Sequence, residues 1–178
     1  SFLNFVNFEN LSRPKKNDWE LSGAVTFYES DVTIDQSTFL NNIKGDDYLN
    51  IVRSDYSISN TVFKNVNSDA FDSDFCKGSL KNSYFINCGN DGIDISGTYL
   101  SIENVNMDSI GDKGISSGEN SKLVANNVQI QNSEIAVCSK DMSEINISNI
   151  TLVSNNIGFT AFQKKPEFGP SSIIATKI

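Results

Sequence analysis

Aspartate and lysine residues recur between positions 69 and 141 in a pattern that could bind a cation or a polar ligand. The charged residues in this pattern are Asp69, Asp72, Asp74, Asp91, Asp94, Lys113, Glu119, Lys140 and Asp141. Asp69 and Asp91 are 22 residues apart, and so are Asp72 and Asp94. A fixed period of this length means that one structural unit stacks on the next, so acids distant in sequence become neighbours. We name these nine residues the acidic face.

Carboxylates in adjacent units repel each other, so the acidic face requires a compensating interaction. Ca²⁺ is one candidate, because it takes about six to eight oxygen ligands, and Asp72 and Asp94 are the candidate ligands. A lysine lying across the acids, Lys113 or Lys140, is a second. In the third alternative the carboxylates are exposed and hydrated, and salt screens their repulsion. The residues themselves leave all three alternatives open.

The residues around these acids predict the strands that position them. Phe71, Ile93 and Ile115 follow each other at steps of 22, and each comes after a small residue. Between such positions apolar and polar residues alternate, which is the pattern of a strand with one buried face. The alternation points Phe71 and Ile93 inward, and it points Asp72 and Asp94 outward.

A column of asparagines has the same period and predicts how the strands are connected. Its members are Asn60, Asn82, Asn104, Asn127 and Asn149, with Gln36 and Asn4 in the equivalent positions nearer the start. Stacked amides hydrogen-bond to each other at strand spacing, and Asn tolerates the left-handed backbone of a tight corner. The pattern predicts an all-β solenoid with an Asn ladder, of seven or eight coils of about 22 residues.

We expect one domain over residues 1–178, interrupted by two loops. Residues 12–22 contain proline and charge without alternation, and they predict a loop inserted at a corner of the coil. Residues 164–172 contain two prolines and predict a second loop. Trp19, in the first loop, would either stack on a sugar ring or cover a terminal coil. Since the chain starts within a strand-like pattern, we expect it to be part of a longer protein whose other domains are possible partners.

Composition argues against several classes of function. The chain has 178 residues, a formal net charge of −8 and no histidine, which rules out catalysis by His and metal binding by His. Its 14 basic residues against 22 acidic ones argue against nucleic acid as a partner. We expect no membrane insertion, because no apolar run is long enough to span a bilayer. The three cysteines have no spacing typical of disulfides or zinc sites, and we expect them in or near the core.

Together the repeat, the inward apolar positions and the Asn ladder resemble the right-handed parallel β-helix family, the architecture of pectate lyases and many other polysaccharide lyases, hydrolases and epimerases. The resemblance covers nearly the whole chain and implies a right-handed, single-stranded parallel β-helix. It also implies a polysaccharide or glycan partner and an extracellular or cell-surface location. A lyase of this family would use Asp-bound Ca²⁺ and a basic side chain, here Lys113 or Lys140.

A hydrolase of this family would use Asp91 and Asp94 as general acid and base, but the His and the Arg-x-Lys motif of such hydrolases are missing. The catalytic candidates are therefore Asp94, Asp91 and Lys113, and the ligand-binding candidates are Asp69, Asp72, Asp74, Glu119, Lys140 and Trp19. The predicted function is a cell-surface or secreted module that presents the acidic face to a polysaccharide. Two alternatives stand beside it: an enzyme acting on that face, and a structural rod that binds nothing.

Overall fold

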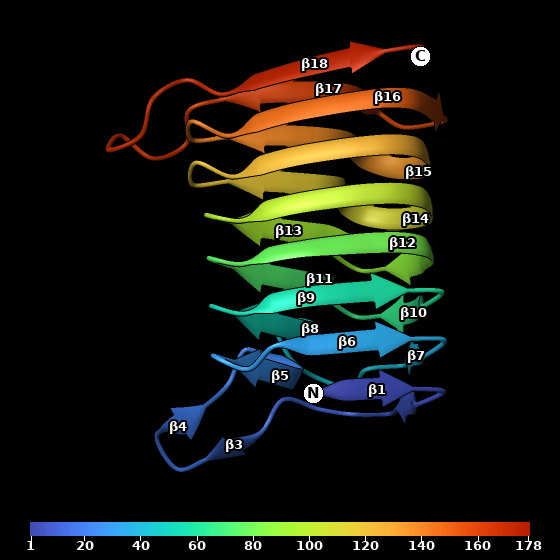
Figure 1. Cartoon of the computed structure of the whole chain (residues 1–178), viewed down its shortest axis with the longest axis vertical. Coiled ribbons are helices and arrows are strands. Elements are labelled where there is room, and N and C mark those ends of the chain that lie inside the picture. Colours follow the sequence, from blue (N-terminus) through green and yellow to red (C-terminus); the bar gives the residue numbers. More distant parts are fainter.

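The computed structural model describes residues 1–178 and is a parallel β-solenoid without helices (Figure 1). It has about six turns of about 22 residues. The sequence predicted seven or eight coils, so the number of turns is somewhat lower than expected. In Figure 1 the nearer strands run left to right as the chain rises from the N-terminus to the C-terminus, and the chain returns behind them, so the coil is right-handed.

Each coil has three sides, which we name the first, second and third side in chain order, and each strand pairs in parallel with its equivalent in the next coil. The first side contains β5 (Gly23–Tyr28), β8 (Asp47–Val52), β11 (Asp69–Asp74), β13 (Ile93–Ser96), the last parts of β14 (Tyr99–Gly118) and β15 (Lys122–Lys140), and β17 (Ile157–Phe162). The second side contains β1 (Phe2–Asn4), β6 (Val32–Asp35), β9 (Asp55–Ser59), the first parts of β12 (Lys77–Cys88), β14, β15 and β16 (Glu144–Val153), and β18 (Ser172–Thr176). The third side contains β2 (Asn7–Glu9), β7 (Thr38–Leu40), β10 (Val62–Val66) and the later parts of β12, β14, β15 and β16.

Apolar side chains fill the interior in continuous files. Phe71 pairs with Ile93, which pairs with Ile115, and all three are fully buried. The predicted interior file is therefore confirmed. On the third side Phe39 and Phe63 belong to a stack of aromatic rings in which successive ring centroids are 4.7 Å apart. This spacing is that of the strands themselves, so each coil adds one ring to the stack.

The predicted Asn ladder lies at the exposed corner between the second and third sides. Asn104 Nδ2 donates to Asn82 Oδ1 at 3.0 Å, and Asn127 Nδ2 donates to Asn104 Oδ1 at 2.8 Å. These asparagines have φ between 49° and 55°, which is the left-handed region. At the N-terminal end the prediction was wrong by one residue. Asn4 pairs with Asp35, so Phe5, with φ of 55°, occupies the ladder position.

A second ladder, which the sequence analysis did not identify, is buried at the corner between the first and second sides. Its side chains accept hydrogen bonds from the backbone N–H groups of the preceding coil. The backbone N–H of Thr98, for example, donates to Ser121 Oγ at 3.0 Å. The members are Ser54, Cys76, Thr98, Ser121 and Ser143. These bonds satisfy backbone donors that the corner would otherwise leave unpaired in the interior.

Both predicted loops lie outside the regular coils. Residues 12–22 connect the third side of one coil to the first side of the next, and they contain a small antiparallel hairpin, β3 (Lys15–Lys16) and β4 (Trp19–Glu20). Figure 1 shows this hairpin projecting at the N-terminal end. The segment between β17 and β18 has no strand and includes the predicted loop 164–172 except for Ser172, which begins β18. The chain forms no helix, so no helical segment could span a membrane.

Candidate functional site

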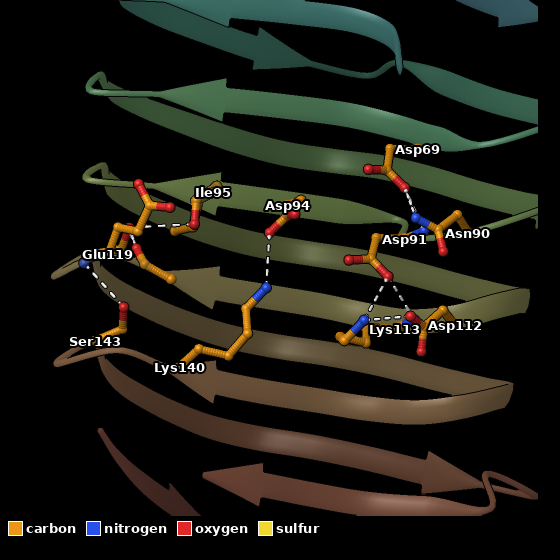
Figure 2. Close-up of polar contacts among 12 residues, drawn as sticks. Asp69, Asn90, Asp91, Asp94, Ile95, Asp112, Lys113, Glu119, Lys140 and Ser143 are labelled. Atoms are coloured by element: carbon orange, nitrogen blue, oxygen red, sulfur yellow. Dashed lines mark hydrogen bonds and ion pairs between the residues drawn. The ribbon is translucent and has the colours of Figure 1, made fainter. Parts of the chain in front are cut away.

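The acidic face lies on the first side, where β11, β13 and the last part of β14 are neighbours. Asp72 pairs with Asp94 in register, so the predicted stacking of these two positions is confirmed. A bend at Gly92, just before β13, interrupts the strand alternation. Asp91 therefore lies beside Asp94 although the two are three residues apart. Figure 2 shows Asp91 and Asp94 on one coil of this side and Asp69 on the adjacent coil.

Backbone amides bind the acids at the start of each coil. Asp69 Oδ1 accepts hydrogen bonds from the backbone N–H of Asp91 at 2.8 Å and from Asn90 Nδ2 at 2.6 Å. Asp91 Oδ1 accepts one from the backbone N–H of Lys113 at 3.0 Å. The same column thus connects three coils, and each carboxylate caps the strand that follows in the next coil.

Two lysines lie across the acids, as the second alternative predicted. Lys113 Nζ is 3.4 Å from Asp91 Oδ1 and also pairs with Asp112. Lys140 Nζ is 3.8 Å from Asp94 Oδ1, two coils away (Figure 2). Neither lysine pairs with Asp69 or Asp72. Lysine bridging therefore compensates part of the acidic face and leaves other carboxylates without a cation.

Two residues of the acidic face are buried, seven are half-buried and none is exposed, so the alternative of freely hydrated carboxylates does not describe it. Asp91 is only 2% exposed, and Ser116, beside Asp94 on the same side, is fully buried. Lys140 contributes to this cover, because a methyl group added at Gly118 would lie 3.4 Å from Lys140 Cε. None of the nine residues lines any of the four surface hollows. None of these hollows therefore lies over the acidic face.

Burial raises the pKa of several carboxyl groups on this side, and the neighbouring carboxylates raise it further. The pKa is about 9 for Asp72, about 7 for Asp69 and about 6 for Asp91. Hydrogen bonds and the Lys113 ammonium oppose the shift of Asp91 without cancelling it. At neutral pH a carboxyl group with a pKa of about 9 keeps its proton, one with a pKa of about 7 is half ionised, and one with a pKa of about 6 is mostly ionised.

Lys113 is poorly suited to act as a catalytic base. Burial lowers the pKa of its ammonium, but the hydrogen bond and charge of Asp112 and the charge of Asp91 outweigh it, so the pKa is raised above its usual value. A base must lose its proton near the working pH. In this environment Lys113 stays protonated and acts as a counter-ion.

Three carboxylates converge closely enough to hold a metal ion. Asp69, Asp91 and Asp94 each offer an oxygen atom, and these atoms all lie within 4.8 Å of one another. Asp94 Oδ1 is buried and accepts no hydrogen bond, and its one charged partner is the Lys140 ammonium at 3.8 Å, which a metal ion would have to displace. The predicted ligand pair was Asp72 and Asp94. The group that the fold assembles contains Asp94 but not Asp72, because the bend at Gly92 brings Asp91 next to Asp94.

The remaining predicted residues lie at the edge of this group or away from it. Glu119 pairs with Lys165 of the C-terminal loop, and burial, the charge of Asp94 and then the charge of Glu119 raise the pKa of Asp74. Asp141 is 1% exposed and accepts hydrogen bonds from two backbone amides of the same loop, so its role is to anchor that loop. Trp19 is 56% exposed on the hairpin, and no hydrogen bond or ion pair connects this hairpin to the acidic face.

Sequence reasoning missed three residues of the site. Asp47 is 3% exposed, precedes Asp69 by 22 residues and pairs with it in register, so the repeat period could have identified it. Asn50 Nδ2 donates to Asp72 Oδ2 at 2.9 Å, and the same period places it one coil before Asp72. Asp112 pairs with Lys113, and no periodic signal marks it.

Comparison with models of known protein families found no match, and comparison with curated proteins found none either. The pairing of the strands shows that the chain is a parallel β-solenoid, and no family is assigned to it.

Proposed function

We propose that this chain is a module of a secreted or cell-surface protein and binds an anionic polysaccharide on its acidic face through a bound Ca²⁺ ion. The observation that carries the proposal is the convergence of oxygen atoms from Asp69, Asp91 and Asp94 within 4.8 Å. Two lysines do not neutralise the acids gathered here, and a divalent cation would supply the missing charge.

The chemistry of the ligands favours calcium over a transition metal. Every candidate ligand atom is a carboxylate oxygen, and hard cations such as Ca²⁺ prefer oxygen ligands. A zinc site normally uses His or Cys, but the chain has no His, and none of its three cysteines belongs to the converging group of ligand atoms. Water and sugar oxygens would complete the coordination sphere, which is how the ion would bring the glycan to the protein.

The glycan partner and the location outside the cell rest on the resemblance to the parallel β-helix family, in which many members act on polysaccharides. An anionic polymer fits the site better than a neutral one, because uronate carboxylates are themselves calcium ligands. Without the ion, the negative charge of the acidic face would repel such a polymer.

Enzymatic turnover is less well supported than binding. A lyase would need Lys113 or Lys140 to remove a proton, but the pKa of Lys113 is raised. A hydrolase would need its two carboxyl groups accessible to substrate and water, but Asp91 is 2% exposed. A rod that binds nothing would have little reason to keep several partly buried carboxylates side by side, since their repulsion destabilises it.

The proposal is tested with purified protein, CaCl₂ and polygalacturonate. Ca²⁺ should raise the melting temperature of the wild type, since a ligand at about 100 times its Kd adds about 2.7 kcal/mol to the free energy of unfolding. Polygalacturonate should bind only when Ca²⁺ is present. Both effects should disappear in Asp91→Asn. This variant keeps the side-chain oxygen that accepts a hydrogen bond from the backbone N–H of Lys113. Glu144→Gln, an exposed charge on the second side, is the matched control and should keep both.

The possible results separate the two parts of the proposal. If Ca²⁺ leaves the melting temperature unchanged, the metal site is wrong. If Ca²⁺ binds but polygalacturonate does not, the polysaccharide function is wrong although the metal site stands. Product formation from polygalacturonate would instead favour the enzyme.

A further inference from the structure

A surface hollow of about 550 Å³ lies outside the acidic face, at the corner between the first and second sides. Its volume is within the range of sites that bind small ligands. The hollow spans adjacent coils, and its lining includes Arg53, Phe75, Lys77 and Tyr99, with Asp31 and Asp55 also contributing. Nothing in the repeat pattern requires aromatic side chains at this exposed corner.

Phe75 occupies a backbone position that suits glycine or asparagine better than an aromatic residue. Its φ is 55°, in the left-handed region, and the equivalent Arg53 and Gly97 also have positive φ. Its side chain is 58% exposed. A bulky residue that is strained and exposed gains nothing for the core, and such strain is concentrated at functional sites.

The neighbouring coil leaves room for the Phe75 ring. Gly97 follows at the equivalent position, and a Cβ atom added there would lie only 2.6 Å from the ring. Because Gly97 has no side chain, the ring packs directly over its backbone. Tyr99, two residues later, is 55% exposed and lines the same hollow. Two aromatic side chains are thus held at the surface of adjacent coils.

The charged groups of the hollow balance each other. Arg53 and Lys77 contribute two positive charges, and Asp31 and Asp55 contribute two negative charges. Arg53 lies 3.6 Å from Glu29 and donates a hydrogen bond to the Tyr28 hydroxyl at 3.1 Å. Glu29 therefore partly neutralises its charge. A strongly charged ligand would gain little here, whereas hydroxyl groups would find both donors and acceptors.

We propose that this corner hollow binds a neutral hexopyranose ring. The apolar face of the sugar packs against Phe75 and Tyr99, and its hydroxyl groups donate to Asp55 and accept from Lys77. Aromatic rings provide large, rigid contact surfaces of this kind at a low cost in side-chain entropy. The site uses residues outside the acidic face and needs no metal ion, so it goes beyond the function proposed above and does not depend on it.

The test uses cellotetraose, mannotetraose and galactotetraose as probes, with EDTA present to exclude metal-dependent binding. Saturation-transfer NMR detects binding, and calorimetry measures the affinity. At least one tetrasaccharide should bind the wild type. Phe75→Asn should weaken it about tenfold, because the ring is lost while asparagine still tolerates the left-handed backbone. Phe162→Asn removes an exposed aromatic ring at the end of β17 and should leave the affinity unchanged.

Two results would overturn the proposal: binding of none of the three tetrasaccharides, or equal affinity in Phe75→Asn and the wild type. Asp91→Asn in EDTA separates this site from the acidic face and should bind like the wild type. If instead Asp91→Asn abolishes binding and Phe75→Asn does not, the sugar binds at the acidic face and the corner hollow is not its site. Circular dichroism and melting curves of each variant confirm that the fold is kept.

Discussion

The Asn ladder and the acidic face have the same geometry but opposite energetics. Both stack equivalent side chains of successive coils at strand spacing, about 4.8 Å. In the ladder an amide can both donate and accept, as Asn104 does: it donates to Asn82 at 3.0 Å and accepts from Asn127 at 2.8 Å. In the acidic face each carboxylate only accepts, and its neighbours bear the same charge. The ladder therefore satisfies itself, whereas the acidic face depends on protons, lysines or a cation.

The Asn ladder is thus a structural element of the solenoid, whereas the acidic face is available for binding. Any coil can extend an amide ladder, because adding one rung creates no charge. Adding one carboxylate to a buried column raises the pKa of those already present, as it does for Asp72, after the larger effect of burial. The repulsion within the acidic face is relieved only when the carboxylates bind a proton, a lysine ammonium or a metal cation.

The largest loss of stability should come from a change in the apolar interior, which supports both the Asn ladder and the acidic face. Phe63 lies within the aromatic stack of the third side, 4.7 Å from the ring centroids of Phe39 and Phe85. Phe63→Ala should lower the free energy of unfolding by about 3–5 kcal/mol, because it leaves a cavity in the interior. Urea denaturation measures this. Phe2→Ala, at a side chain that is 69% exposed, should cost far less, and equal losses in the two variants would contradict the interior stack.

An intermediate effect should distinguish the acidic face from the amide ladder by pH. Carboxyl groups whose pKa is raised on folding stabilise the protein below their unfolded pKa of 3.8, and this stability is lost as pH rises through the folded values of about 6 for Asp91, about 7 for Asp69 and about 9 for Asp72. In EDTA, the free energy of unfolding should therefore decrease from pH 5 to pH 9, as measured by urea titrations across that range.

Asp72→Asn supplies the control for this pH dependence. The amide has no proton to lose, so the decrease in stability between pH 5 and pH 9 should become smaller. At the alkaline end the variant should be more stable than the wild type. A pH dependence as steep in Asp72→Asn as in the wild type would contradict the role of Asp72.

The smallest effect should come from removing one rung of the Asn ladder. Asn104→Ala loses the hydrogen bonds to Asn82 and Asn127 and places alanine at a φ of 55°, which should cost about 1–2 kcal/mol. Asn104→Gly loses the same bonds without the backbone strain and should be destabilised less. The loss should not depend on pH between 5 and 9. If it does, the ladder is coupled to the acidic face after all.

The period of 22 residues alone determined the solenoid, the inward file of Phe71, Ile93 and Ile115, and the corner position of the Asn ladder. It could do so because each of these features depends only on which residues stack, and stacking follows directly from equal spacing. The N-terminal register was predicted wrongly because Phe5 breaks the composition of the ladder, and a column of one residue type cannot locate a member of another type.

Only the tertiary structure decided the chemistry of the acidic face. Alternation along a strand distinguishes inside from outside, but it does not show that an outward side such as that of Ser116 is covered. Nor does it show that a bend at Gly92 groups Asp91 with Asp94 and leaves Asp72 out. Burial, charge compensation and metal affinity depend on distances between side chains of different columns, and a one-dimensional repeat contains no information about those distances.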